Sequence, residues 1–448
     1  MIKTSFHRNI NINEMSASEL ETVKKALTRY SRDYMTGDMI ATAYYYINGD
    51  TLQVPRFFPL RPGVPDIDVS ESGKELSKDV KLSPNISYRA GQEKSILEGM
   101  SENVLTLMKP PGSGKTVIGS SVIINRHVRA MIVVDQKNLQ DQWCKALDMV
   151  GVNVDYSVKM DFENPEEHDV YIVTIQALLA SIRKLGIPEA GKVYESLHIG
   201  NVILDEVHCL IGPDKFSEVC HIINSRYVLA LSATPKDDIY VKYWLGNTVR
   251  GDRNYSVSPK IFDMIYNTKA VKSHKYIEFG GKFLRNRYAE RIFTKNDSLY
   301  TDMICSLVYK SYLANRHVLV IMNYNESGVD IIHSRLVDMI GDDKVARYVS
   351  GCDKDIEEKK PVIVSNYKML QKGTDIPSLD TLIMAEPPAN ATGLEQTIGR
   401  ILRINKGIKK KQLLVFDITD YAYGGPMLRW REIRKNFYNE KNFEHIKK

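Results

Sequence analysis

The sequence predicts an α/β protein in which two successive parallel-sheet lobes follow a small α+β unit at the N-terminus. The first observation is length, because 448 residues exceed what one hydrophobic core usually organises. The second is a recurring order of short apolar runs and helix-length amphipathic segments, which is typical of buried parallel strands covered by helices. The third is that these runs form two separate series, which indicates two similar lobes.

The composition is that of a globular chain in water. Hydrophobic residues make up 43% and charged residues 26% of the sequence, with no sign of global disorder. No apolar run approaches about 18 residues, so a membrane span is not expected. The N-terminal stretch "MIKTSFHRNI" lacks the apolar core of a signal peptide. The five cysteines are never spaced as C-x-x-C, which favours free thiols in a cytoplasmic protein over disulfides or a zinc site.

The N-terminal unit is expected to contain one helix and one hairpin. Ser16 or Ser18 can cap the helix that follows them. Two β-prone runs flank Asn48-Gly49, a pair that suits a type I′ turn. The predicted domain order is a small N-terminal domain (1–60), a linker rich in Pro, Gly, Ser and acidic residues (61–80), a first lobe (81–250), an inter-lobe segment (251–296) and a second lobe (297–448).

The strands of both lobes are predicted from their apolar runs. A hairpin is expected at Gly280-Gly281 in the inter-lobe segment. The runs of the first lobe are Val104–Met108, Met131–Val134, Val170–Ile175, Val202–Leu204 and Tyr227–Leu231. Those of the second lobe are Val318–Met322, Val362–Val364, Leu382–Met384 and Leu413–Phe416.

The stretch "KPPGSGKT" is predicted to be a phosphate-binding loop, although Lys109 stands where the pattern G-x-x-x-x-G-K-[ST] has its first glycine. It follows a predicted strand and opens a predicted helix, which is the context this motif requires. Glycines let the backbone N–H groups face phosphate oxygens, and a lysine and a hydroxyl then reach the phosphates and Mg²⁺. The residues expected to perform these roles are Gly112, Ser113, Gly114, Lys115 and Thr116.

The stretch "VILDEVH" supplies the second pair of groups that a phosphate-binding loop needs for hydrolysis. Asp205 and Glu206 end an apolar strand. Asp205 is expected to hold Mg²⁺ together with Thr116, and Glu206 to orient and deprotonate the attacking water. The alternative is that the acidic pair only ends a strand.

Six motifs in this order resemble the superfamily 2 helicases, over roughly Ser87 to Ile418. They are the phosphate-binding loop, "DEVH", "LSATP", "VIVSNYKMLQKGTDIP", "QTIGRILR" and, upstream, "SYRAGQ". The resemblance implies two tandem RecA-like P-loop lobes that use ATP and Mg²⁺. It also implies that Gln92 reads adenine, that Asp375 belongs to the nucleotide site, and that Ser232, Thr234 and His208 relay the nucleotide state between lobes.

The "QTIGRILR" motif implies a catalytic role for Gln396, Arg400 and Arg403. Hydrolysis develops negative charge on the γ-phosphoryl oxygens, and arginines supplied by the second lobe stabilise that charge. Arg400 and Arg403 are three residues apart, so a helix presents them on one face. The alternative for any single arginine is a solvated surface position.

Other details favour the branch of the superfamily that acts on DNA. Motif II reads D-E-V-H, and Thr397 stands where RNA-dedicated relatives carry an arginine. "VVDQKNLQDQW" is similar to an element of DNA-acting relatives, and the compact chain resembles UvsW-type bacteriophage branch-migration and fork-reversal helicases. This resemblance implies that the protein works in the host cytoplasm. Its partner would be DNA, especially forks and junctions gripped through the backbone, and no oligomer is required.

Candidate nucleic-acid contacts are Lys137, Gln142, Thr174, Gln176 and Asn323, each of which could instead be a polar cap at a strand end. The stretch from Asn405 to Lys448 holds eleven Lys and Arg against five Asp and Glu, which suggests backbone contacts by "KGIKKK" and "RWREIRK". Aromatics of the N-terminal unit could stack on unpaired bases or form the core of a small sheet; they are Tyr44, Tyr45, Tyr46, Phe57 and Phe58, beside Arg56. Three function classes stay open: a DNA-remodelling motor, an RNA helicase, and an ATPase that senses nucleic acid without moving it.

Overall fold

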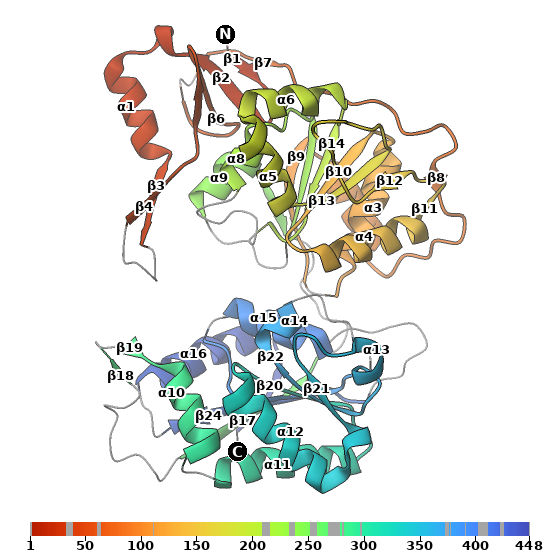
Figure 1. Cartoon of the computed structure of the whole chain (residues 1–448), viewed down its shortest axis with the longest axis vertical. Helices are drawn as coiled ribbons and strands as arrows, with labels where there is room; N and C mark the ends of the chain where they lie inside the picture. The colour runs from red at the N-terminus through yellow and green to blue at the C-terminus, as the bar shows by residue number, and fades with distance from the viewer. Residues whose placement is uncertain are drawn as a thin grey trace. The chain divides into compact units, whose positions relative to one another are not determined.

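The chain forms two compact units, Met1–Asp252 and Arg253–Lys448 (Figure 1). The structure is a computed structural model that describes residues 2–32, 39–60, 64–110, 112–207, 216–232, 238–250, 258–267, 278–279, 282–295, 298–371, 376, 378–389, 391–401, 411–421 and 425–447. Each unit is an α/β lobe, and the first also carries a small mixed sheet at its N-terminus. None of the helices in the described ranges is long and apolar enough to cross a membrane.

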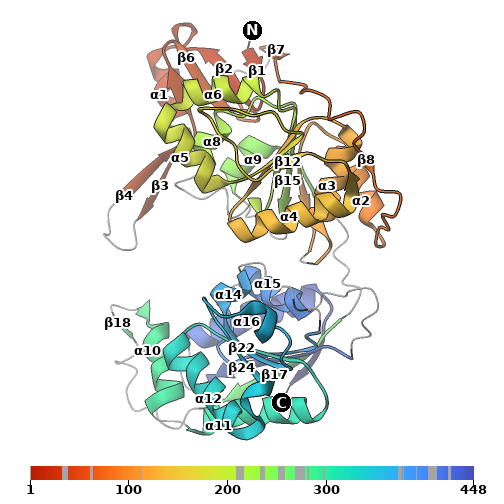
Figure 2. The ribbon, with the colours of Figure 1, turned by 45° about the vertical axis from the view of Figure 1, so that its right-hand side comes forward.

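The N-terminal part is a five-stranded sheet with one helix against it (Figure 2). Its strand order is β5-β6-β2-β1-β7, and a separate ribbon of β3 and β4 extends from it. Ser16, rather than Ser18, caps the helix, because its Oγ accepts a hydrogen bond from the N–H of Glu19 at 3.1 Å. The elements are β1 (Ile2–Thr4), β2 (His7–Asn11), α1 (Ala17–Ala26), β3 (Thr28–Arg32), β4 (Met39–Ala43), β5 (Tyr46–Asn48), β6 (Thr51–Pro55) and β7 (Asp66–Asp68).

The predicted hairpin exists, but its turn lies one residue further along. Asn48 pairs with Thr51, so the two turn residues are Gly49 and Asp50. Gly49 has φ +55°, and Asp50 is not among the residues with positive φ. A positive φ at the first turn position alone is the pattern of a type II′ turn, which needs glycine there.

The segment expected to be a linker packs along the first lobe. Strand β7 pairs in parallel with β1. Glu71 and Glu75 then form isolated bridges to Ser225 and Val128 of the lobe. The segment's own hydrophobic side chains at positions 76 and 80 are buried in the core of the lobe. Apolar side chains among the acidic ones therefore attach this segment to the lobe.

The first lobe is a parallel seven-stranded sheet of order β12-β13-β10-β14-β15-β9-β16. All five predicted strands are present, and the additional strands β12 and β16 are short edge strands. The strands are β9 (Val104–Met108), β10 (Ala130–Val134), β12 (Tyr156–Ser157), β13 (Val170–Thr174), β14 (Asn201–Leu204), β15 (Tyr227–Ser232) and β16 (Thr248–Arg250), with β8 (Lys81–Leu82) and β11 (Gly151–Val152) paired separately. The helices are α2 (Gln92–Met100), α3 (Lys115–Arg126), α4 (Lys137–Val150), α5 (Ile175–Leu185), α6 (Ile187–Ser196), α8 (Phe216–Cys220) and α9 (Ile239–Leu245).

The second lobe is another parallel seven-stranded sheet, of order β21-β22-β20-β23-β24-β17-β25. The predicted hairpin is represented by β18 (Glu278–Phe279) and β19 (Lys282–Phe283), which pair on either side of Gly280-Gly281. The other strands are β17 (Lys260–Tyr266), β20 (Val318–Met322), β21 (Val345–Tyr348), β22 (Val362–Asn366), β23 (Thr381–Met384), β24 (Leu414–Asp420) and β25 (Glu444–Lys447). The helices are α10 (Arg285–Glu290), α11 (Ser298–Leu313), α12 (Asp330–Ile340), α13 (Lys354–Glu357), α14 (Tyr367–Gln371), α15 (Ala391–Ile401) and α16 (Gly425–Glu440).

Strand β17 comes from the range that the sequence predicted to be an inter-lobe segment. It pairs along its whole length with β24 and with β25 at the other side. Buried and partly exposed residues alternate along β17, whereas the central strands are continuous apolar runs. The sequence signal for a buried strand is therefore weaker in β17. This pattern explains why the sequence did not reveal it as a sheet strand.

Helices cover both faces of each sheet. In β20, alternate residues enter two different hydrophobic clusters, Val318 and Val320 on one face and Leu319 and Ile321 on the other. Successive side chains of a strand point to opposite faces, so a strand buried on both faces must be apolar throughout. The carboxyl ends of these parallel strands then share one edge of the sheet, where polar loops gather.

Candidate functional site

The phosphate-binding loop connects β9 to the first turn of α3. Gly112 and Gly114 have φ values of +78° and +80°, which favour glycine at both positions. Gly114 is the N-cap of α3, and Lys115 is its first residue. The unpaired N–H groups at a helix start attract phosphate, so this loop has the backbone that an anion site needs. Pro111 lies outside the described residues.

Lys109, at the position of the missing first glycine, is buried behind the loop. Its Nζ lies 3.2 Å from Glu98 Oε2 of α2, and its backbone N–H donates to the carbonyl of Ser232 at 3.0 Å. Its side chain is only 8% exposed. Lys109 therefore anchors the start of the loop to α2 and β15.

Gln92, expected to read adenine, is buried against the same loop. Its Nε2 donates to the carbonyl of Ser113 at 3.1 Å, and its Oε1 accepts the N–H of Arg89 at 2.7 Å. A Cβ on Gly114 would lie 2.2 Å from Gln92 Nε2. Glycine at 114 is therefore required by its φ and by the close approach of this amide.

The acidic pair lies directly after β14, at the same edge of the sheet. Glu206 Oε1 lies 3.2 Å from Lys115 Nζ, so the structure brings these two predicted site residues together. Asp205 is buried, and its Oδ1 accepts the N–H of Glu206 at 2.9 Å. Glu206 has φ +48°, an unusual conformation for a residue other than glycine. Such local strain is a common feature of functional sites.

Trp143 is a site residue that the sequence analysis did not single out. Its Nε1 donates to Asp205 Oδ2 at 2.8 Å from α4, so both carboxylate oxygens of Asp205 are held. The indole is fully buried, and a Cβ on Gly119 of α3 would lie 2.5 Å from its Cη2. Burial and the nearby Glu206 charge raise the pKa of Asp205 to about 6. The Gln-Trp pair that ends "VVDQKNLQDQW" was the available signal.

This donor set fits Mg²⁺ held together with phosphates. In the part of the chain that the structure describes, no three His, Cys, Asp or Glu side chains gather as a metal site. Mg²⁺ is usually bound by one or two carboxylates, water and substrate phosphates rather than by a full protein cage. Asp205 and Thr116 are the residues that would hold it here.

Three predicted nucleic-acid contacts lie at the carboxyl ends of β10 and β13, at the same edge of the first sheet. Thr174 caps α5, because its Oγ1 accepts the N–H of Ala177 at 3.3 Å. Gln176 Nε2 donates to Asp135 Oδ1 at 3.2 Å, and Lys137 at the start of α4 is exposed. Thr174 thus serves as the strand-end cap that was its alternative interpretation, whereas Lys137 is exposed at the surface.

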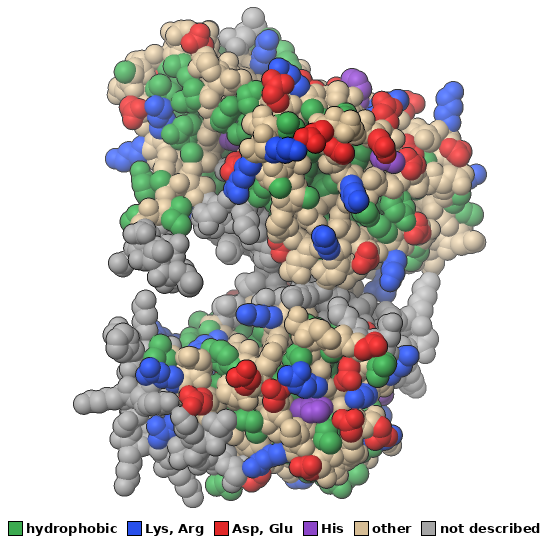
Figure 3. All heavy atoms as spheres, viewed as in Figure 1, with side chains coloured by type: hydrophobic (Ala, Val, Ile, Leu, Met, Phe, Trp, Pro, Cys, Tyr) green, Lys and Arg blue, Asp and Glu red, His purple; other side chains and the backbone are tan. Residues whose placement is uncertain are grey.

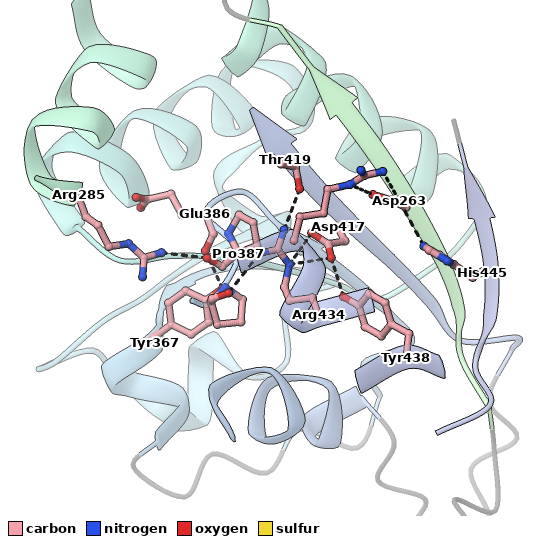
Figure 4. A network of polar contacts seen from close by, with 12 residues as sticks. Asp263, Arg285, Tyr367, Glu386, Pro387, Asp417, Thr419, Arg434, Tyr438 and His445 are labelled. Carbon is pink, nitrogen blue, oxygen red and sulfur yellow. Dashed lines mark hydrogen bonds and ion pairs between the residues drawn. The ribbon is translucent and has the colours of Figure 1, made fainter. Parts of the chain in front are cut away.

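In the second lobe, Asn323 lies beside a buried carboxylate. Its backbone N–H donates to Glu386 Oε2 at 2.8 Å, and burial raises the pKa of Glu386. The backbone carbonyl of Glu386 accepts a hydrogen bond from the Tyr367 hydroxyl at 2.8 Å, and Arg285 reaches the neighbouring Pro387 carbonyl at 2.9 Å (Figure 4). Asn323 is thereby fixed at the carboxyl end of β20.

The basic segment "RWREIRK" is helix α16, and its arginines are not all available to nucleic acid. Arg434 is 1% exposed and pairs with Asp417 at 2.8 Å (Figure 4). Arg431 pairs with Asp263. The expectation that this whole segment contacts phosphates is therefore wrong for these two residues, because buried carboxylates neutralise them. On the face shown in Figure 3, blue basic and red acidic side chains are interspersed.

The "KGIKKK" stretch lies outside the described residues up to its last lysine. Lys411 Nζ donates to the carbonyls of Ala314 and Asn315, at 2.7 and 2.9 Å. These carbonyls follow the C-terminus of α11, where a cation is favourable. Lys411 therefore has a structural role.

The remaining predicted positions are only partly described. Gln396 and Arg400 lie one helical turn apart on α15, and only their backbone is described. Ser232 ends β15 in a fully buried position. His208, Thr234, Asp375 and Arg403 lie outside the described residues.

Two N-terminal aromatics belong to the core instead of stacking on bases. Tyr44 is fully buried and stacks on Tyr240 at a centroid distance of 4.2 Å. Phe58 is 6% exposed and meets Tyr243 edge-on at 5.0 Å. The sheet-core interpretation holds for both, because helix α9 of the lobe covers them.

Two family models match the chain in this order. The first, type III restriction enzyme, res subunit, matches residues 85–237, and the second, helicase conserved C-terminal domain, matches residues 353–405. Transcript termination protein A18 of Yaba-like disease virus is 24% identical over 332 residues, covering 70% of this chain and 67% of that protein. Transcript termination protein OPG145 of Variola virus is 24% identical over 364 residues, covering 78% and 68%.

Solved structures show the same fold at low identity. S. cerevisiae Dbp5 bound to RNA and ADP BeF3 aligns with a TM-score of 0.54 and 12% identity, over 81% of this chain and 90% of that chain. T4 UvsW aligns over 100% of this chain and 99% of that chain at 16% identity, with a TM-score of 0.37. The two RecA-like lobes and the two consecutive family matches, the second of them to the helicase conserved C-terminal domain, support a superfamily 2 helicase.

Proposed function

We propose that the protein is an ATP-driven DNA motor that remodels branched DNA by branch migration, fork reversal or unwinding. One observation carries the hydrolytic part of this proposal. Lys115, Asp205 and Glu206 meet beside a glycine loop at the start of α3, with Asp205 held at both oxygens. These are the groups that phosphoryl transfer to water requires in one place.

Each side chain has a distinct task in this proposal. Lys115 binds the β- and γ-phosphates, which would then replace its present partner Glu206. Glu206, released from that ion pair, orients the attacking water and accepts its proton. Asp205 and Thr116 hold Mg²⁺, which neutralises phosphate charge when bound. Gln92 recognises adenine beside the loop.

The second lobe contributes Gln396, Arg400, Arg403 and Asp375 to the same nucleotide. Arginines that meet the developing charge of the γ-phosphoryl group stabilise the transition state more than the bound substrate. Arg400→Ala and Arg403→Ala are each expected to lower kcat by about 10³-fold or more, with modest change in ATP affinity. An ATP turnover assay on the whole chain measures kcat, and a nucleotide titration measures the ATP affinity. Normal stimulated turnover in both variants would exclude the role.

DNA is the nucleic acid that we propose as the substrate of the motor, for two reasons. The first lobe matches a restriction-enzyme subunit, and its α4 element resembles that of DNA-acting relatives. Lys137 is exposed at the start of α4, where a backbone phosphate can reach it. Contacts to phosphates carry no sequence information, which suits a motor that must pass every base.

A second candidate is a motor that acts on transcription complexes or on RNA. The observation that favours it is the set of poxvirus relatives named transcript termination proteins, together with an RNA-bound structural neighbour. Such a motor would share the same ATP site. It would differ in the nucleic acid that stimulates hydrolysis.

A panel of substrates tests the choice. ATP turnover and strand movement are measured with single strands, blunt duplex, forks, four-way junctions and RNA duplexes at one fixed salt concentration. We expect the strongest stimulation and remodelling on forks and junctions. Equal or better activity on RNA duplexes would exclude the DNA proposal. Stimulation by DNA without strand movement would leave an ATPase that senses DNA.

A further inference from the structure

A cavity of about 270 Å³ lies inside the first unit, away from the phosphate-binding loop. One wall is the N-terminal sheet, and the opposite wall is α6 with the turn that follows α8. Figures 1 and 2 both show α6 beside this sheet. The cavity therefore lies where the N-terminal part meets the first lobe.

The wall on the sheet side is a polar face that the strand register builds. Gln53 of β6 is paired with Asn9 of β2 on one side and with Tyr46 of β5 on the other. Directly paired residues share a face, so these three side chains form a row across the sheet. The alternate positions of β6, Leu52 and Val54, are fully buried in the hydrophobic core. The cavity face is thus polar on a sheet whose other face is apolar.

Several residues that line the cavity carry buried polar atoms without a partner among the described residues. Neither ring nitrogen of His221 has a hydrogen bond to a described residue, although its side chain is only 5% exposed. The same holds, within the described part of the chain, for Gln53 Oε1 and Asn224 Oδ1. All three residues line the cavity. Buried polar groups without partners destabilise a fold and usually indicate water or a ligand.

The cavity offers no net charge to its contents. Burial lowers the pKa of His7 to about 4 and that of His221 well below its usual value, so both imidazoles are neutral near pH 7. Lys192 and Glu195 of α6 also line the cavity and carry opposite charges. Neutral donors and acceptors beside the Tyr46 ring suit a flat, uncharged, hydrogen-bonding group.

We propose that this cavity binds one nucleobase, supplied by an unpaired nucleotide of a bound DNA strand or by a free nucleotide. A base presents a π-face to the Tyr46 ring, which itself packs on the His221 ring at a centroid distance of 5.8 Å, and polar edge atoms to Gln53 and Asn224. The volume is smaller than the cavities of about 300–1,000 Å³ that enclose drug-sized ligands, as expected for a single base. The strand source rests on the proposed function as a DNA motor.

Gly191 of α6 allows a matched pair of variants. It lines the cavity, and a Cβ placed on it meets no atom within 4 Å. Gly191→Leu fills the cavity, whereas Gly191→Ala adds one methyl group at the same helical position. Both substitutions favour the helix relative to glycine, so neither is expected to unfold the unit. A third variant, His221→Phe, keeps a ring but removes both nitrogens.

Two sets of probes distinguish the sources of the base. Adenosine, cytidine, guanosine and thymidine are titrated by equilibrium dialysis with saturating ADP in the phosphate-binding loop. A short single-stranded DNA is compared with a matched strand that carries no bases. We expect Gly191→Leu and His221→Phe to weaken base-dependent binding by about 5- to 150-fold, and Gly191→Ala to change it less than about twofold. The base-free strand should bind all variants alike.

The outcomes separate this inference from the motor function. Nucleoside binding that Gly191→Leu abolishes supports the site with a free-nucleotide source, and loss of base-dependent strand binding supports the strand source. If neither probe distinguishes Gly191→Leu from Gly191→Ala, the cavity holds water only and the inference is wrong, even if DNA still stimulates ATP hydrolysis. Absence of DNA stimulation in the wild type would instead refute the motor, while the nucleoside titration still decides the cavity.

Discussion

Glu206 and Lys115 form an ion pair at 3.2 Å, yet replacing one should affect hydrolysis and replacing the other should affect nucleotide binding. Glu206→Gln keeps the size of the side chain but removes the base, so ATP should still bind while hydrolysis falls to near background. Lys115→Ala removes the phosphate counter-charge, so nucleotide affinity itself should fall. Fluorescent-nucleotide titration and turnover measured on the same samples separate the two. Near wild-type turnover in Glu206→Gln would contradict the assigned role.

Trp143 holds the carboxylate that would bind Mg²⁺, through the hydrogen bond from its Nε1 to Asp205. Trp143→Phe keeps an aromatic ring in the core but leaves Asp205 Oδ2 without this donor. We expect kcat to fall by about tenfold or more and the Mg²⁺ concentration for half-maximal nucleotide binding to rise, since a hydrogen bond to a charged group contributes about 1.5–3 kcal/mol. The KM for ATP should change less than kcat.

Trp244 provides the matched control for that substitution. It is also fully buried in the first unit, and its Nε1 has no hydrogen-bond partner in the described structure. Trp244→Phe should therefore lower stability through packing alone, with the Mg²⁺ dependence unchanged. Equal Mg²⁺ shifts in the two variants would show that Trp143 acts only through packing.

Helix α16 shows how an element can be basic in sequence and neutral in the fold. Arg434 is buried with Asp417, whereas Arg429 on the same helix is exposed. Removing one partner of a buried pair leaves an uncompensated charge, so Arg434→Ala should lower the free energy of unfolding by about 3–5 kcal/mol. Arg429→Ala should change it by less than about 0.5 kcal/mol. Denaturant titration of both variants makes the comparison.

The same helix limits which side chains can contact DNA. If α16 meets the phosphate backbone, Arg429→Gln should make the log–log salt slope of duplex binding shallower by about 0.9. Arg431→Met should leave the slope unchanged, because Asp263 already pairs with Arg431. Identical slopes in both variants and the wild type would place the DNA elsewhere on the second lobe.

At the scale of the whole molecule, the N-terminal part and the first lobe share one core. Phe6 and Tyr44 of the N-terminal part pack on Trp244 and Tyr240 of the lobe. Deleting the N-terminal part would expose the aromatics of the lobe and would also remove any DNA contact that this part makes. Point variants at the cavity therefore test its function better than truncation does.

Two buried histidines at this junction make the stability of the first unit depend on pH. The folded pKa of His7 is about 4, against about 6.5 when unfolded, so the unfolded chain binds more protons between these values. The contribution of neutral His7 to the free energy of unfolding is complete above about pH 6.5 and is lost as the pH falls towards 4. For His7 alone it amounts to about 3 kcal/mol, and His221 adds to it in the same direction.

Denaturant unfolding at pH 7 and pH 4.5 measures this dependence. The double variant His7→Gln with His221→Phe should lose much less stability on acidification than the wild type. His333→Gln, at a partly exposed position on α12, is the control and should follow the wild type. If the double variant loses as much stability between pH 7 and pH 4.5 as the wild type, the acid sensitivity comes from other groups.

The sequence alone determined the central strands and the order of the catalytic motifs. A parallel strand covered on both faces must be apolar throughout, so runs such as Val104–Met108 and Val318–Met322 can be recognised as buried strands from the sequence. The phosphate-binding loop and the pair Asp205-Glu206 are likewise local patterns. Their positions at the ends of such strands place them at one edge of a sheet.

Only the tertiary structure decided which distant groups meet. Trp143 and Asp205 are 62 residues apart, and β17 pairs with a strand more than a hundred residues later. The arginines of α16 look like nucleic-acid contacts until Asp417 and Asp263 are seen beside them. Burial and hydrogen-bond partners depend on which elements pack together, and that packing is a property of the whole chain rather than of any local pattern.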